Sequence, residues 1–197
     1  MKRIFSALAT VILLITWGSA GADAHITPVV HLLKHNEAIK QLIPDGTSFY
    51  VRKVRIGKTA LQHIKSAVDW TPGTDEYKFY YGKNPKGEMA GDVLFISQDS
   101  KHGPVVLAVA FSPDNTIRGV RITDATVETL PWMKTLMAHN FTDTFQDKTA
   151  VDDAAVRTRA DQENLGAMPR YFAGIIATGV EHALALQRVL FRVQPVQ

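Results

Sequence analysis

Hydrophobic and polar positions in the middle of the chain fall into short segments with the pattern of β-strands. Segments 76–81, 89–97, 105–111 and 117–124 are rich in β-branched and aromatic residues, and stretches rich in Gly, Pro, Asn and Asp separate them. Segment 105–111 is apolar throughout, which is typical of a strand buried on both faces. The pattern therefore predicts an antiparallel β-meander.

Helical patterns flank this meander on both sides. Residues 30–43 carry a loose apolar stripe that ends at a proline, and 57–68 is predicted to be a second helix after a strand at 48–56. After the meander, a helix at 131–140 begins with a proline, whose missing N–H costs little there. Residues 169–192 predict a last helix with one continuous apolar stripe. That stripe consists of Phe172, Ile175, Ile176, Gly179, Ala183, Leu186 and Leu190. The predicted fold class is α+β, an antiparallel β-meander flanked by N-terminal and C-terminal helices.

The first 24 residues have the layout of a secretory signal peptide. Two basic residues precede an uncharged apolar run at 4–17, and the small-residue sequence Ala22-Asp23-Ala24 stands before His25. The apolar run is shorter than the roughly 20 residues that a membrane span needs, so cleavage is favoured over a retained anchor. We therefore expect residues 1–24 to be a signal peptide, residues 25–197 to form a single domain, and the mature protein to be periplasmic.

Composition narrows the chemistry of the mature domain. The chain has no cysteine, which excludes disulfides, a C-x-x-C-H haem attachment and thiolate metal sites. Two of the 22 basic and one of the 19 acidic residues lie in the signal peptide, which leaves 20 against 18 and a net charge of +2. This balanced charge indicates no nucleic-acid partner. No G-x-S-x-G sequence or paired-carboxylate arrangement points to hydrolysis, so nothing at residue level supports an independent enzyme.

Four segments of the mature chain carry motifs in a defined order. Residues 89–93 (Met-Ala-Gly-Asp-Val) lead into a strand, and residues 112–120 have the composition of a hairpin. Residues 127–131 (Val-Glu-Thr-Leu-Pro) are similar to an E-T-P-G loop with an inserted leucine and no glycine. Residues 141–148 are similar to an F-x-x-Q-F-x-G-K segment, with Thr and Asp replacing its Gln and Gly. In this order the segments resemble the FMN-binding domain of the C subunit of sodium-pumping NADH:quinone reductase and of the G subunit of the Rnf complex.

The resemblance implies an extracytoplasmic FMN-binding domain that lacks one functional residue. In the family, the flavin phosphate is esterified to the threonine of an S-G-A-T motif directly before the last helix. That motif aligns here with Leu165-Gly166-Ala167-Met168, where a thioether replaces the hydroxyl. A second register, Thr158-Arg159-Ala160-Asp161, places Asp161 at the acceptor position. Neither Ser nor Thr lies between Arg159 and Ala177, so we expect any bound FMN to be held non-covalently.

The predicted site lies between the loop at 128–131 and the turn at 164–168. The resemblance brings these segments together, and the small residues of the turn would let backbone N–H groups face a phosphate at a helix N-terminus. Leu130, Trp132 and Met168 would cover an aromatic ring. Helix capping by Thr129, and an ordinary tight turn at 164–168, are the simpler alternatives. The predicted cofactor-binding residues are Glu128, Thr129, Leu130, Trp132, Leu165, Gly166, Ala167 and Met168.

Methionines and histidines leave a metal or haem site open as an alternative. Met133 and Met137 lie four residues apart, His139 follows them, and Met168 stands where the threonine is missing. Such side chains suit copper or haem iron, but methionines filling the space of a flavin ring would give the same pattern. His31 and His35 have the spacing of metal ligands, which a solvated helix face explains more simply.

The predicted function is extracytoplasmic electron transfer, or an accessory role in a membrane redox complex, with FMN held non-covalently. The expected partner is a membrane-bound redox complex or another extracytoplasmic redox protein. Two alternatives remain: a flavin-free docking or assembly module, and a periplasmic carrier of metal or haem.

Overall fold

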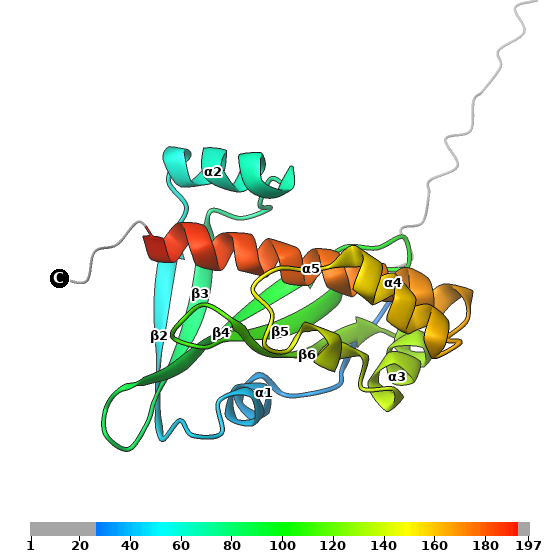
Figure 1. The fold of residues 1–197 in the computed structure, drawn as a ribbon, viewed down its shortest axis with the longest axis horizontal. Coiled ribbons are helices and arrows are strands. Elements are labelled where there is room, and N and C mark those ends of the chain that lie inside the picture. The colour runs from blue at the N-terminus through cyan, green and yellow to red at the C-terminus, as the bar shows by residue number, and fades with distance from the viewer. Residues whose placement is uncertain (1–26, 193–197) are drawn as a thin grey trace, which may run out of the picture.

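The computed structural model describes residues 27–192. The predicted signal peptide, residues 1–24, and its cleavage site before His25 therefore lie outside the described residues. The described chain forms one six-stranded antiparallel sheet with helices on both faces (Figure 1), which confirms the predicted α+β class. None of the described helices is long and apolar enough to cross a membrane.

The sheet has the strand order β1-β6-β5-β4-β3-β2, and every pair of neighbours is antiparallel. Its strands are β1 (Val29–His31), β2 (Ser48–Arg55), β3 (Glu76–Lys83), β4 (Met89–Gln98), β5 (Val105–Phe111) and β6 (Ile117–Thr126). Strands β3 to β6 form the predicted meander. The turn between β3 and β4 forms because the Asn84 side chain accepts hydrogen bonds from the backbone N–H groups of Lys86 and Glu88. Gly87 closes this turn with φ +81°, a backbone conformation that favours glycine.

The helices cover the two faces of the sheet unequally. They are α1 (His35–Leu42), α2 (Lys58–Val68), α3 (Leu130–Ala138), α4 (Asp153–Gln162) and α5 (Ala167–Arg192), with a 3₁₀ helix η1 at Phe141–Phe145. Helix α5 runs along one face against β4 and β5, and α2, α3 and α4 pack against α5 (Figure 1). Helix α1 covers part of the other face, at β5 and β6. As a result, the outer part of that face, at β2 and β3, carries no helix (Figure 1).

The main core lies between α5 and the sheet. The predicted stripe of α5 is buried, from Phe172 to Leu190, except that Ile175 is half-buried. Gly179 fits this interface because a Cβ there would come within 2.8 Å of Leu107 Cδ1. Strand β5 is buried at every position but Val106, which confirms the prediction of a strand covered on both faces.

One predicted helix differs from the structure, and two elements of the structure are not predicted. The helix expected at 30–43 is interrupted: Val29–His31 pair with β6 as an edge strand, and α1 begins only at His35. This pairing joins residues almost a hundred positions apart, so no local pattern reveals it. The hydrophobic pattern predicts neither η1 nor α4, and α4 buries only Val156 and Ala160, so it has no apolar stripe.

Candidate functional site

The turn between α4 and α5 has the backbone conformation that its sequence requires. Asn164 and Gly166 both have positive φ, at +48° and +78°. A Cβ at Gly166 would meet no described atom within 4 Å, so the glycine is needed for its backbone conformation rather than for space. Leu165 is buried and its N–H bonds to the Ala160 carbonyl, which anchors the turn directly before α5.

The two registers proposed for the flavinylation motif differ in their local structure. Residues Leu165 to Met168 form the turn and the first residues of α5, whereas residues 158 to 161 lie inside α4. In the first register the acceptor position, Met168, is the second residue of α5, and in the second register Asp161 lies near the end of α4. The Met168 side chain is half-buried and packs against the main core.

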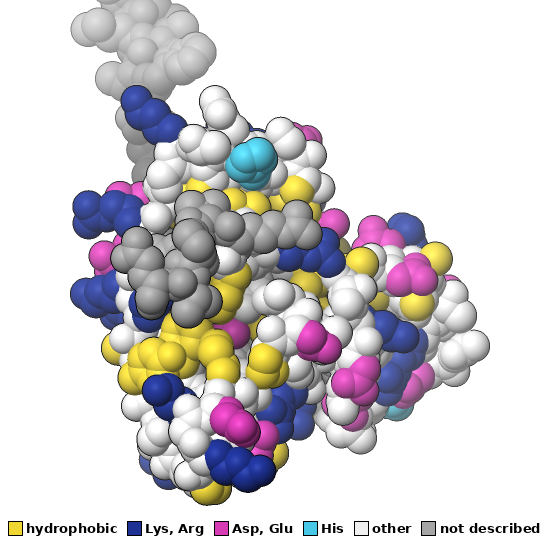
Figure 2. Space-filling view, turned by 60° about the vertical axis from the view of Figure 1, so that its left-hand side comes forward, with side chains coloured by type: hydrophobic (Ala, Val, Ile, Leu, Met, Phe, Trp, Pro, Cys, Tyr) yellow, Lys and Arg dark blue, Asp and Glu magenta, His cyan; other side chains and the backbone are white. Residues whose placement is uncertain are grey.

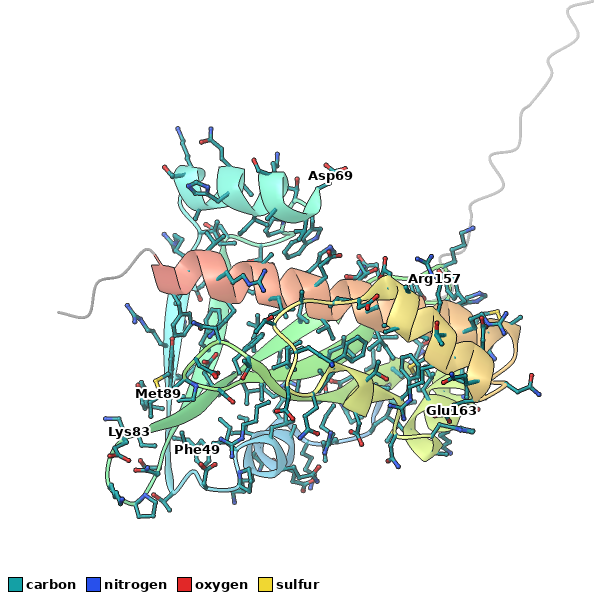
Figure 3. The ribbon with its side chains drawn as sticks, viewed as in Figure 1. Phe49, Asp69, Lys83, Met89, Arg157 and Glu163 are labelled. Carbon is teal, nitrogen blue, oxygen red and sulfur yellow. The ribbon has the colours of Figure 1, made fainter. Side chains whose placement is uncertain are left out.

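A cavity of about 510 Å³ lies between α4 and α5, beside this turn. Its lining includes two arginines, Arg157 on α4 and Arg170 in the first turn of α5, and Arg170 Nη2 is 2.7 Å from Asp161 Oδ1. Figure 3 shows Arg157 on α4, which lies beside the first turns of α5. The cavity is lined by Asp153, Val156, Arg157, Ala160, Ala167, Arg170, Tyr171, Ala173, Gly174, Ile175 and Thr178. Of the predicted site residues, Ala167 belongs to this wall.

Tyr171 connects the cavity to the loop that precedes α3. It lines the cavity, and its ring meets the rings of Phe172 and His102 edge-on at centroid distances of 5.1 Å and 6.5 Å. His102 Nδ1 is in turn 2.5 Å from Glu128 Oε1. The structure thus brings the predicted residue Glu128 to the same end of the molecule as the turn at 165–168.

Other predicted residues of this loop have structural roles. Thr129 is fully buried, and its hydroxyl exchanges hydrogen bonds with Thr126 on β6. It occupies the N-cap position of α3, but its side chain makes no capping hydrogen bond. Trp132 is half-buried and stacks on Phe172, with ring centroids 5.2 Å apart and an interplanar angle of 22°. Leu130, the first residue of α3, is half-buried.

Comparison with known proteins finds no match. No family model, curated protein or solved structure matches the chain. The resemblance to the FMN-binding domain therefore rests on the motifs and their order.

The residues considered as metal ligands lie in different environments. Met133 is fully buried in the core, whereas Met137 is 43% exposed. His139 Nδ1 hydrogen-bonds to Glu163, and this bond lowers the pKa of the glutamate. Within residues 27–192, no group of three or more His, Asp and Glu side chains is arranged to hold a metal ion.

His31 and His35 are both exposed to solvent, as predicted, but they do not share a helix face, because they belong to different elements. His31 ends β1 and His35 begins α1. Both rings turn toward the buried carboxylate of Asp124: His31 Nδ1 hydrogen-bonds to Oδ1, and His35 Nε2 lies 3.6 Å from Oδ2. These contacts join β1 and α1 to β6.

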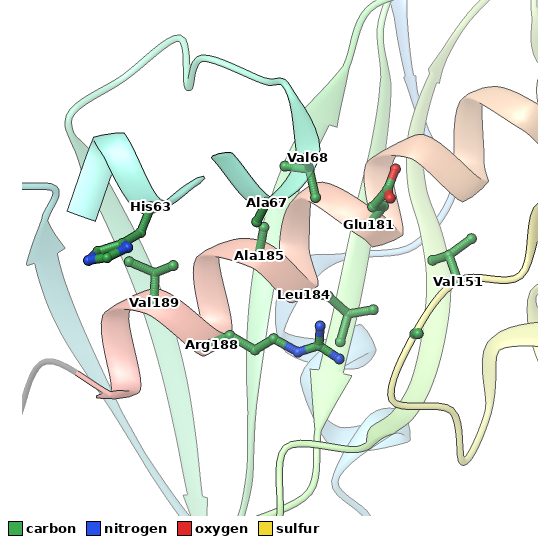
Figure 4. Close-up of a pocket in the computed structure, with 10 residues that line it drawn as sticks. His63, Ala67, Val68, Val151, Glu181, Leu184, Ala185, Arg188 and Val189 are labelled. Carbon is green, nitrogen blue, oxygen red and sulfur yellow. The ribbon is translucent and has the colours of Figure 1, made fainter. Parts of the chain in front are cut away.

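Sequence reasoning missed the arginines of the cavity, and also a larger cavity farther along α5. Arg170 follows Ala167 by three residues, so it lies on the same face of α5, and this spacing was the available signal. The second cavity, of about 730 Å³, lies between α2 and α5 (Figure 4). Its lining is mainly apolar, with His63, Glu181 and Arg188 as the ionisable side chains.

Proposed function

We propose that the chain binds FMN non-covalently at the start of α5 and acts in extracytoplasmic electron transfer, by itself or as an accessory to a membrane-bound redox complex. The observation that carries this proposal is the cavity between α4 and α5, which adjoins the turn at 165–168 and contains two arginines. The motif resemblance supports the same end of α5 on independent grounds.

The groups around the cavity suit a flavin mononucleotide. Arg157 and Arg170 are permanent cations that bind phosphate through charge-assisted hydrogen bonds. At the amino end of α5, the backbone N–H groups of Ala167 and Met168 and the positive end of the helix dipole favour an anion. Val156, Tyr171 and Ile175 offer apolar and aromatic surface to a ring. The cavity volume of about 510 Å³ falls within the range of roughly 300–1,000 Å³ that is usual for small-molecule sites.

Without an acceptor hydroxyl at position 168, these contacts have to retain the cofactor by themselves. Micromolar affinity corresponds to about 8 kcal/mol, and each hydrogen bond to a charged group contributes about 1.5–3 kcal/mol. Arg157 and Arg170 would therefore supply about half of the binding free energy, and apolar contacts with the ring the remainder. When bound, the flavin would supply the electron-transfer chemistry, while the chain binds and orients it.

Titration of the mature protein with FMN and with riboflavin, followed by flavin fluorescence, tests this proposal. Riboflavin has the same ring but no phosphate, so we expect FMN to bind at least about tenfold more tightly. If neither flavin binds, or if both bind equally well, the proposed phosphate site is wrong and the flavin-free docking module becomes the better function.

Non-covalent attachment has a separate test. Coexpression with a flavin transferase, followed by a denaturing gel under ultraviolet light, should give no fluorescent band. A band would contradict non-covalent binding. Thr158 and Thr178 would then be the residues to substitute, and Thr178 is a hydroxyl-bearing residue of the cavity wall.

A further inference from the structure

Strand β2 forms a long open edge of the sheet. Among the described residues it pairs with β3 alone, in register from Ser48 opposite Lys83 to Arg55 opposite Glu76. Its other side therefore presents a row of backbone N–H and C=O groups without a neighbouring strand. All eight residues of β2 are exposed except Val54, which is half-buried. The opposite edge of the sheet is different, because β1 has only three residues.

Apolar side chains are exposed along this edge. Phe49, Tyr50 and Val51 are 37%, 47% and 51% exposed, and Met89 at the start of β4 is also exposed. Figure 2, which brings the β2 side of the molecule forward, shows hydrophobic side chains at the surface beside Lys and Arg side chains. Figure 3 shows Phe49, Lys83 and Met89 at the same end of the sheet. A long edge with exposed apolar residues is the feature that other strands use for pairing.

The edge is also strongly basic. Residues 48–55 contain three basic and no acidic residues, and residues 76–83 contain two basic and one acidic residue, which gives a net charge of +4 for the two strands together. Lys53 and Arg55 lie near carboxylates, Lys53 Nζ at 3.6 Å from Glu76 and Arg55 Nε at 3.8 Å from Asp75. Arg52, Lys78 and Lys83 have no carboxylate partner within the described chain, and Lys83 lies over the ring of Tyr50.

We propose that β2 binds an extended, acidic segment of a partner protein as an additional strand of the sheet. Backbone hydrogen bonds would provide affinity, and alternate side chains of the segment would meet the apolar and the basic residues of the edge. A second copy of this chain fits less well, because two edges of charge +4 would repel one another. An anionic membrane also fits less well, since lipid leaves the backbone groups of an open edge without hydrogen-bond partners.

Binding of synthetic peptides to the mature protein tests this proposal. The probe is a fluorescein-labelled peptide of alternating Thr and Glu. The controls have the same length: one alternates Thr with Lys, and the other is the Thr-Glu peptide methylated at every backbone nitrogen. We expect the Thr-Glu peptide alone to raise the fluorescence anisotropy, because the Thr-Lys peptide has the wrong charge and the N-methylated peptide cannot donate backbone hydrogen bonds. Hydrogen exchange of the β2 amides should slow on binding, which simple charge attraction would not cause.

A charge-reversed variant and its control locate the contact. Arg52→Glu combined with Lys83→Glu should weaken peptide binding by about tenfold or more. Lys65→Glu combined with Lys134→Glu, which reverses two exposed charges on α2 and α3, should leave binding nearly unchanged. Both double variants should retain the circular dichroism spectrum of the parent protein. FMN affinity is measured on the same samples and is not expected to depend on β2, so this proposal and the proposed flavin site can fail separately.

Three results would overturn the proposal. The first is equal binding of the Thr-Glu peptide with and without N-methylation and without protection of the β2 amides, which would indicate charge attraction only. The second is binding to phosphatidylglycerol vesicles in preference to the peptide. The third is a stable dimer in sedimentation experiments that the Arg52→Glu and Lys83→Glu changes abolish.

Discussion

Asp92 on β4 is a carboxylate enclosed between the sheet and α5. It is 1% exposed, and its Oδ1 accepts a hydrogen bond of 3.1 Å from Gln187 Nε2. Its Oδ2 has no hydrogen-bond partner within the described chain. Burial raises the pKa of Asp92 to about 7, and the hydrogen bond from Gln187 offsets only part of this effect. Below about pH 7 the folded protein therefore favours the protonated form of Asp92.

This raised pKa determines how stability should depend on pH. In the unfolded chain Asp92 titrates near its ordinary value of 3.8, so the folded state holds the proton more tightly between about pH 4 and pH 7. Proton binding by Asp92 therefore stabilises the folded protein. This stabilisation is fully present below pH 4 and is lost as the pH rises through about 7. Asp92→Asn removes the charge and keeps a hydrogen-bonding side chain. It should raise the free energy of unfolding at pH 8 by a few kcal/mol and flatten the pH dependence.

Urea unfolding at pH 5 and at pH 8 measures both effects. The control is Asp99→Asn, which changes an exposed aspartate near the end of the same strand and should alter neither value by more than about 0.5 kcal/mol. If Asp92→Asn lowers the stability at pH 8, then the ionised carboxylate is satisfied in the folded protein and the pKa argument is wrong.

Arg170 provides the most direct residue-scale prediction about the proposed flavin site. Arg170→Gln removes a cation from the cavity wall, so FMN should bind about 10- to 100-fold more weakly, as expected for the loss of 1.5–3 kcal/mol. The affinity for riboflavin should stay the same, because riboflavin lacks the phosphate. Flavin fluorescence titration measures both affinities.

The ion pair of Arg170 offers a matched control for this prediction. Asp161→Asn breaks the same 2.7 Å contact from the other side but leaves the guanidinium free to bind phosphate. It should therefore keep or strengthen FMN binding. Equal weakening by Arg170→Gln and Asp161→Asn would show that the ion pair acts only on the structure of the turn.

At the scale of elements, α5 contains one glycine that is packed against the sheet and one that is not, so substitutions at the two positions separate packing from helix propensity. Gly179 faces the sheet, where a Cβ would come within 2.8 Å of Leu107 Cδ1, whereas a Cβ at Gly174 would meet no described atom within 4 Å. Gly174→Ala should stabilise the protein by about 0.5–1 kcal/mol through helix propensity. Gly179→Val should destabilise it by about 1–3 kcal/mol, because it overpacks the core.

Chemical denaturation of the flavin-free protein checks this pair. The two substitutions are predicted to change the free energy of unfolding in opposite directions. Both replace a glycine and so restrict the unfolded chain in the same way, which means that an effect on the unfolded state cannot explain the difference. Stabilisation by Gly179→Val would mean that Leu107 moves aside at little cost and that the interface of α5 with β5 is loosely packed.

The elements that the sequence predicts correctly are those whose pattern is local. Segment 105–111 is apolar throughout, and the stripe of α5 repeats at spacings of three and four, so both follow from single stretches of chain. Strand β1 exists only because Val29–His31 pair with residues 124–126. Helix α4 starts instead from a cap, since the Asp152 side chain accepts hydrogen bonds from the N–H groups of Ala154 and Ala155. Capping aspartates of this kind are visible in a sequence but common in turns as well.

At the scale of the whole molecule, half of the candidate site follows from the sequence. The sequence predicts the turn at 164–168, and the last two of these residues begin α5. The cavity beside it was not predicted, because its second wall is α4, which has no apolar stripe to reveal it. Arg157 and Asp153 reach the cavity only through the packing of α4 on α5. The hydrophobic pattern therefore predicts individual elements, but it does not predict which elements pack together to form a cavity.

The last prediction concerns the mature chain, which we expect to begin at His25. The basic residues, the apolar run at 4–17 and Ala22-Asp23-Ala24 motivate this prediction. Cleavage there leaves four residues before β1, which starts at Val29, so the pairing of β1 with β6 would stay intact. Intact-mass spectrometry of the exported protein should give the mass of residues 25–197. Ala24→Leu places a bulky residue where a signal peptidase needs a small one, and it should retain the uncleaved chain in the membrane fraction. If the unaltered protein itself retains Lys2 and Arg3, the segment is an anchor, and the domain acts while tethered to the membrane.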